Sequence, residues 1–143
     1  MSLTRKAALG VVACTAGALL TGTMGTAHAE GDLYGAFAIA NLDDSTHIVG
    51  RWNYPDQASA DADALSECGY SNCFIKLRWV NGCAAYSRRD NDLFWAVGAT
   101  RAEAERNALA AAGPDPNPLL VSLGSAEPST ATLRHSACTA NAG

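Results

Sequence analysis

The sequence predicts an α+β fold in which two alanine-rich helices pack on an antiparallel β-sheet and disulfide bonds join distant segments. Three observations predict it. The chain has two alanine-rich stretches with helix-capping signals, several short apolar runs separated by turn residues, and four cysteines after residue 29. With 143 residues, the chain is long enough for one small domain.

Residues 1–29 have the features of a cleaved secretory signal peptide. Met1–Lys6 is basic, Ala7–Leu20 is apolar, and an A-x-A cleavage site ends at Ala29. We therefore expect cleavage after Ala29 and a secreted, extracytoplasmic protein. An alternative is lipidation at Cys14, although that cut would leave only about five apolar residues before the site.

Residues 30–143 form the expected single domain, and they are acidic. The whole chain has a formal charge of −4, and residues 1–29 contribute two cations and no acid, so residues 30–143 have a net charge of −6. This balance argues against a nucleic-acid partner, because phosphate neutralisation needs clustered cations. No uncharged apolar run after residue 29 approaches the ~20 residues of a membrane span, so we expect no membrane association after cleavage.

The domain begins with two predicted strands. Leu33–Ala40 is a short apolar run typical of a buried strand, and the polar segment Asn41–Thr46 is a turn. The alternating segment His47–Tyr54 is a second strand that places Trp52 and Tyr54 on the same face.

A helix and a third strand follow. Asp56 is placed to cap a helix over Ala58–Cys68, and Gly69 occupies the position after the last helical residue. Cys73–Val80 is the clearest strand of the sequence. Its apolar face is predicted to consist of alternate residues, namely Cys73, Ile75, Leu77 and Trp79.

Two further strands come from a predicted hairpin. Asn81-Gly82 is the strongest two-residue hairpin signal in the chain, and Cys83–Ser87 is predicted to be the partner strand of Cys73–Val80. A polar turn over 88–92 then leads to another strand, Leu93–Val97.

The second helix opens with a capping box at Thr100–Glu103 and ends near Gly113. The proline-rich segment 114–118 cannot continue the helix and is expected to be a stiff linker. The C-terminal segment 119–143 begins with an apolar run and contains the last strand, Leu133–Cys138.

The two predicted helices resemble each other. Ala58–Gly69 and Ala102–Gly113 share their spacing of alanine, acidic, leucine and glycine residues at an offset of 44. This similarity predicts an internal duplication of a strand–strand–helix–strand unit. The alternative is a chance similarity between alanine-rich helices.

Cysteine usage predicts a disulfide framework, because an even number in a small exported domain is typical of paired thiols. The four cysteines after the signal segment are Cys68, Cys73, Cys83 and Cys138. Structural zinc is the competing interpretation, but it usually needs two close cysteine pairs, and only one pair is close here.

Three pairings of the four cysteines are open. We favour Cys68–Cys73, because that pair brackets the turn-rich segment Gly69–Asn72, which leaves Cys83–Cys138 as the second bond. A Cys68–Cys83 bond is the alternative.

The chain also carries an ordered set of short motifs: YGAFA at 34–38, GRWNYP at 50–55, CG and C within 68–73, GCAAY at 82–86 and VGAT at 97–100. In this combination it resembles the small exported bacterial proteins grouped as domain-of-unknown-function family 4189. The resemblance covers a core of about 34–113, and Cys138 is similar to the family's C-terminal cysteine. It implies a secreted disulfide-bonded domain and no assigned catalytic residues.

Catalytic signals are weak. His47, His135, Ser87 and Asp44 could supply parts of a hydrolytic triad, but no nucleophile elbow surrounds any serine. Residues 90–92 begin like a calcium loop and lack the glycine and glutamate that complete one. We therefore assign no catalytic, cofactor-binding or metal-binding residue, and expect no cofactor.

Aromatic residues are the remaining candidates for function, as anchors of a binding surface. They are Trp52, Tyr54, Trp79 and Trp95. We expect a secreted, non-catalytic interaction or binding module whose partner is a protein or a cell-envelope ligand. The alternatives are a small secreted hydrolase centred on His47 or His135, or an effector directed at a host or at the cell envelope.

Overall fold

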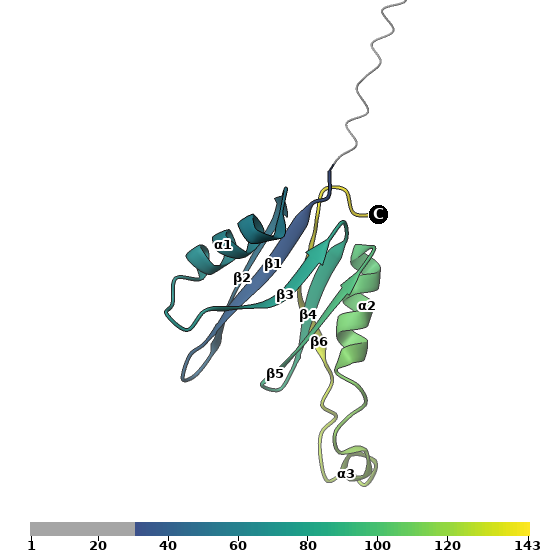
Figure 1. Ribbon diagram of the computed structural model, residues 1–143. Helices are drawn as coiled ribbons and strands as arrows, with labels where there is room; N and C mark the ends of the chain where they lie inside the picture. Colours follow the sequence, from purple (N-terminus) through teal and green to yellow (C-terminus); the bar gives the residue numbers. More distant parts are fainter. Residues whose placement is uncertain (1–30) are drawn as a thin grey trace, which may run out of the picture.

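A computed structural model describes residues 31–143, so the predicted signal segment 1–29 and the Cys14 alternative lie outside the described residues. Figure 1 shows two three-stranded antiparallel sheets, each with one helix beside it. The α+β class and the disulfide bonds Cys68–Cys73 and Cys83–Cys138 are as the sequence predicts. The strands form two sheets, however, where the sequence predicts one. The strands on either side of Asn81-Gly82 lie in different sheets, so the hairpin predicted there is wrong.

The first sheet is built from β1 (Tyr34–Asn41), β2 (Thr46–Tyr54) and β3 (Phe74–Val80), in the order β2-β1-β3. Helix α1 (Gln57–Cys68) connects β2 to β3. The Asp56 carboxylate caps this helix by accepting a hydrogen bond from the Ser59 N–H at 2.7 Å, and Gly69 ends it with a φ of 71°.

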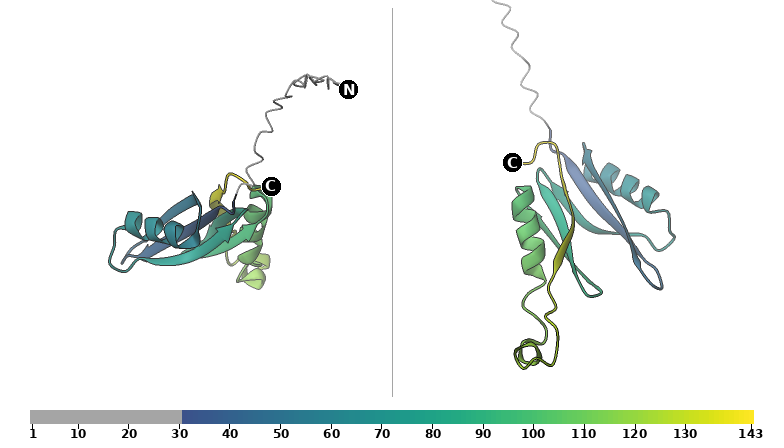
Figure 2. Two further views of the ribbon diagram at one scale, coloured as in Figure 1. Left: turned by 45° about the horizontal axis from the view of Figure 1, so that its top comes forward. Right: turned by 180° about the vertical axis from the view of Figure 1, so that it is seen from behind.

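The second sheet repeats this arrangement. Strands β4 (Cys83–Arg89), β5 (Asp92–Gly98) and β6 (Thr132–Cys138) have the order β5-β4-β6, and α2 (Arg101–Ala111) lies between β5 and β6 in sequence. The short helix α3 (Pro118–Ser122) lies in the connection from α2 to β6, away from the sheets in both views (Figure 2). The predicted stiff linker 114–118 therefore runs into a helix at its last residue.

The sheets stack face to face between the helices, which gives the layers α1, first sheet, second sheet, α2 (Figures 1 and 2). Buried alanines of β1 contact Ala60 and Ala64 of α1, while Ala104 and Ala108 of α2 contact Cys83 and Ala85 of β4. These small side chains allow each helix to lie close to its sheet. Larger side chains fill the space between the sheets.

Two β-bulges correct the predicted strand faces. Tyr34 pairs with Tyr54 and Gly35 with Trp52, which leaves Asn53 as an extra residue with a φ of 70°. Consecutive residues of β1 point to opposite faces, so Trp52 and Tyr54 also face opposite ways, and the prediction that they share a face is wrong.

The second bulge lies in β3. Leu77 pairs with Phe37 and Ile75 with Ala38, so Lys76 is the extra residue. Ile75 consequently packs toward α1, while Leu77 packs between the sheets. The single apolar face predicted for this strand is therefore divided between two layers.

The bulge in β3 has a counterpart at the corresponding position of the second sheet. In the second sheet the register shifts between Tyr86 and Ser87, and Arg134 of β6 is the extra residue. The equal sheet order, the shared strand–strand–helix–strand order and this one matching bulge support the predicted duplication, which remains a prediction. Within residues 31–143, helix α3 and the bulge at Asn53 have no counterpart in the other half.

Candidate binding cleft between the sheets

An aromatic cluster fills the centre of the space between the two sheets. Phe37 of β1 is 1% exposed and lies at its middle. The ring centroids of four other side chains lie 5.0–6.1 Å from that of Phe37: Trp79, Trp95, Tyr86 and His135. Such tilted and edge-on pairs add to the free energy of burial, so this cluster holds the two sheets together.

Two glycines make room for the cluster on the first sheet. A Cβ atom on Gly35 would lie 2.3 Å from the Trp79 indole, and one on Gly50 would lie 2.5 Å from the Phe37 ring. Glycine is therefore required at both positions, because an aromatic side chain lies where a Cβ atom would be.

A cleft of about 600 Å³ is lined by residues of both sheets. The lining includes residues of the β1–β2 and β4–β5 turns, which lie at the same end of the molecule (Figure 1). This volume is in the range of small-ligand sites. Its apolar lining comes from both sheets and consists of Leu42, Ile48, Tyr86 and Leu93. Its polar lining consists of Asn41, Asp43, Asp44, Ser45, Thr46, Arg88, Asn91 and Arg134.

The charged groups of the cleft are divided between its two sides. Asp43 and Asp44 belong to the β1–β2 turn, whereas Arg88 and Arg134 belong to β4 and β6 of the second sheet. Among residues 31–143 no ion pair joins these two sides. The cleft thus has one acidic and one basic side that do not neutralise each other.

The two arginines differ in how they are held. Arg88 donates hydrogen bonds to the Asp90 carbonyl at 2.7 Å and to the Asn91 side-chain oxygen at 3.3 Å, which fix it beside the turn. In the described part of the chain, the Arg134 guanidinium has no ion-pair partner.

Tyr86 lines the cleft and is half-buried. Burial raises the pKa of its phenol, and the Arg134 guanidinium acts in the opposite direction. The phenol is therefore neutral at physiological pH and offers both a hydrogen-bond donor and an acceptor.

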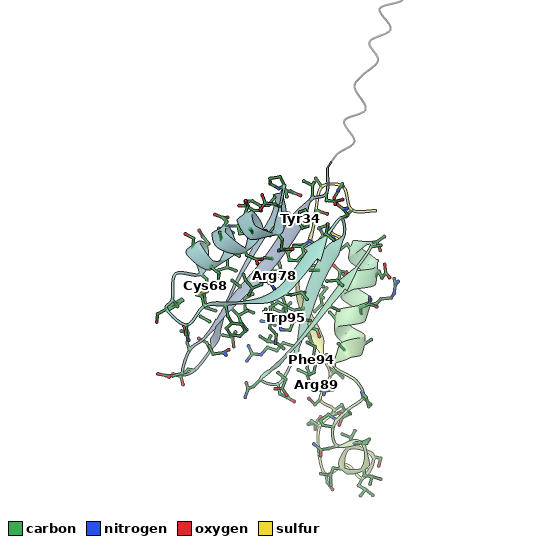
Figure 3. All side chains as sticks on the ribbon, in the orientation of Figure 1. Tyr34, Cys68, Arg78, Arg89, Phe94 and Trp95 are labelled. Atoms are coloured by element: carbon green, nitrogen blue, oxygen red, sulfur yellow. A yellow bond between two sulfur atoms is a disulfide. The ribbon has the colours of Figure 1, made fainter. Side chains whose placement is uncertain are left out.

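The four aromatic residues expected to form a binding surface lie in different places. Trp79 is 5% exposed within the core, and Trp95 also packs against the core between the sheets (Figure 3). The Tyr54 hydroxyl donates to Asp63 on α1 at 2.5 Å, on the other side of the first sheet. Trp52 is the one of these four that is exposed, at 37%.

Ser87 and His47, two of the residues considered for a hydrolytic triad, lie in different surroundings. Ser87 is fully buried beneath α2, where its hydroxyl donates to the Ala108 carbonyl at 2.6 Å. His47 packs instead against Tyr70, with ring centroids 5.2 Å apart, so this serine and this histidine do not act together.

The cysteines form disulfides, so the zinc interpretation is wrong. No group of three or more His, Cys, Asp or Glu side chains within residues 31–143 is arranged to hold a metal ion. In the same range no helix is long and apolar enough to cross a membrane.

Sequence reasoning did not identify Tyr86, Arg88 or Arg134 as site residues. No sequence signal marks Arg134, because its position depends on a register shift in β6 that the structure alone shows, as it does for the equivalent Lys76 in β3. The other two alternate along β4 with buried residues, but strand alternation alone does not show that a second sheet faces them.

Comparison with known proteins shows a family and no function. The model of the family described as "Domain of unknown function (DUF4189)" matches residues 34–116. Protein Rv1269c of Mycobacterium tuberculosis and Protein Mb1300c of Mycobacterium bovis are each 37% identical to the chain over 83 residues. That match covers 57% of this chain and 63% of each relative, which is less than two thirds of their length. No solved structure matches the chain.

Proposed function

This chain belongs to the DUF4189 family, and we propose that it is an exported, non-catalytic binding module whose ligand occupies the cleft between the sheets. The ligand is a protein segment or a component of the cell envelope. Nucleic acid and membrane are not expected partners, because the domain is acidic and its cations are scattered.

The cleft is the observation that carries this proposal. It combines apolar side chains from both sheets with separated charged groups, so a ligand could be held by burial and oriented by charge. The aromatic cluster behind it joins the sheets, so the walls are expected to keep their spacing when the cleft is empty.

Export is the second part of the proposal. Two disulfides support it, because such bonds persist mainly in oxidising compartments. The n-region, apolar segment and A-x-A site of residues 1–29 support it independently.

The binding experiment is an NMR titration of the full chain, with its disulfides formed, against a mixed panel of short peptides and soluble cell-wall oligosaccharides. Saturable shifts of the Tyr86 and Leu93 amide signals are expected for at least one probe. The variant Leu93→Trp fills the cleft and should abolish those shifts. Val97→Trp is the matched control, because Val97 lies on the same strand, is 44% exposed and does not line the cleft. Equal binding by both variants, or binding by no probe, would refute the proposal.

The export experiment measures the mass and location of the protein made in its own host. A form that starts at Glu30 outside the cytoplasm is expected. A cytoplasmic form that retains residues 1–29, or a diacylated N-terminus at Cys14, would contradict this part of the proposal.

A further inference from the structure

We infer that the ligand of the cleft is a short zwitterionic peptide, with its carboxylate at Arg134 and its ammonium group at the Asp43–Asp44 turn. This inference rests on the proposed function, because it names the chemistry of a ligand for the same cleft. Three features of the cleft support it: the division of charge, the apolar side chains in the lining and the volume of about 600 Å³.

The basic side selects a carboxylate. Arg134 lines the cleft and has no ion-pair partner within residues 31–143. A guanidinium presents a planar fork of donors that matches a carboxylate, and such charge-assisted pairs are the stronger hydrogen bonds of proteins. Arg88, already held by Asp90 and Asn91, adds positive charge on the same side.

The acidic side selects a cation and rejects a polyanion. Asp43 and Asp44 are both exposed and occupy consecutive positions of the turn that faces the basic side across the cleft. Two carboxylates there attract an ammonium group and repel a second phosphate or carboxylate of a highly charged anion. A neutral oligosaccharide would leave both charged sides without a partner.

Apolar side chains also line the cleft. Ile48 comes from the first sheet, and Leu93 and Tyr86 come from the second. A ligand that contacts both charged sides and carries an apolar side chain could bury that side chain against them. A peptide of three to five residues combines these groups.

The test uses defined peptides in three forms. Tri-, tetra- and pentapeptides with leucine or phenylalanine at a central position are titrated unblocked, N-acetylated and C-amidated, and the amide signals of the cleft are followed by NMR. Blocking either end is expected to weaken binding about tenfold. If blocked and unblocked peptides bind equally, the inference is wrong.

Charge variants assign each end of the peptide. Arg134→Ala should weaken the unblocked peptide about tenfold, and in this variant C-amidation should have no further effect. The double variant Asp43→Asn/Asp44→Asn should also weaken the unblocked peptide about tenfold, and in this variant N-acetylation should have no further effect. The matched controls are Arg106→Ala and Glu127→Gln, which remove exposed charges outside the cleft and should leave binding unchanged. Equal losses in a cleft variant and its control would refute the assignment.

The outcomes distinguish a failure of the peptide inference from a failure of the proposed function. If oligosaccharides of the mixed panel bind the cleft and no peptide does, the peptide inference fails while the proposed function stands. If no probe of either kind shifts the cleft signals, both fail.

Discussion

Replacement of Gly35 by alanine should destabilise the protein through one contact. The new Cβ would lie 2.3 Å from two carbons of the Trp79 indole, whereas carbon atoms in contact prefer ~3.5–4.0 Å. The indole cannot move away freely, because it is 5% exposed and its ring centroid is 5.0 Å from that of Phe37. Overpacking of this kind costs about 1–3 kcal/mol, and we expect Gly35→Ala to lie at the upper end.

The assay is thermal and urea unfolding of the full chain with its disulfides formed. For a domain of this size, 1–3 kcal/mol corresponds to a decrease in Tm of roughly 4–12 °C. Gly31→Ala is the control, because nothing lies within 4 Å of its Cβ position. It also measures the small gain in stability that is expected because alanine leaves the unfolded chain less conformational freedom than glycine does.

A double-mutant cycle identifies the contact. In a Trp79→Leu background the indole is absent, so Gly35→Ala should be nearly neutral. Either of two results would refute the reasoning. One is a Gly35→Ala protein as stable as Gly31→Ala, and the other is an equal loss with and without the indole.

Three further predictions concern other contacts. Removal of the Cys83–Cys138 bond, which spans 55 residues, should lower the free energy of unfolding by about 4 kcal/mol. Removal of the Cys68–Cys73 bond, with a separation of 5, should lower it by about 2 kcal/mol. Equal losses in urea unfolding would contradict the explanation by loop entropy. Ser87→Ala removes the buried hydrogen bond to Ala108 and should cost about 1 kcal/mol in the same assay, and no loss would show that this bond contributes nothing. Backbone N–H groups lower the pKa of the Asp115 carboxyl, so its contribution to stability is present above the ordinary aspartate pKa and is lost as pH falls through the lowered value. Asp115→Asn should therefore be less stable than the parent at neutral pH and equally stable in strong acid, and a difference that persists in acid would overturn this assignment.

Within the candidate site, the sequence could predict residue types better than their arrangement. Trp79 and Trp95 are candidate anchors of a binding surface from the sequence alone, and the structure places both against the core between the sheets. Strand alternation says which residues share a face, but it does not say whether solvent or another sheet covers that face. Arg134 could not be placed for a further reason, since its position depends on a bulge that the sequence does not mark.

The sequence alone determined the local structure and the covalent framework. Capping residues such as Asp56 and Thr100 and the glycines after the helices act within a few residues of themselves, so their effects can be recognised in the sequence. Asn81-Gly82 is an exception, because the strands on either side of it enter different sheets and do not pair as a hairpin. The disulfide pairing was predicted for a similar reason, because a turn-rich segment separates Cys68 from Cys73.

Only the tertiary structure decided that the strands form two stacked sheets with a cleft between their turns. The formation of two sheets depends on which strands pair with β1 and with β4. It also depends on large aromatic side chains that fill the space between the sheets. These contacts join residues far apart in sequence, and one extra residue in a strand reverses the faces that follow it. The sequence therefore specified the elements, and the packing of aromatic side chains between the sheets specified the site.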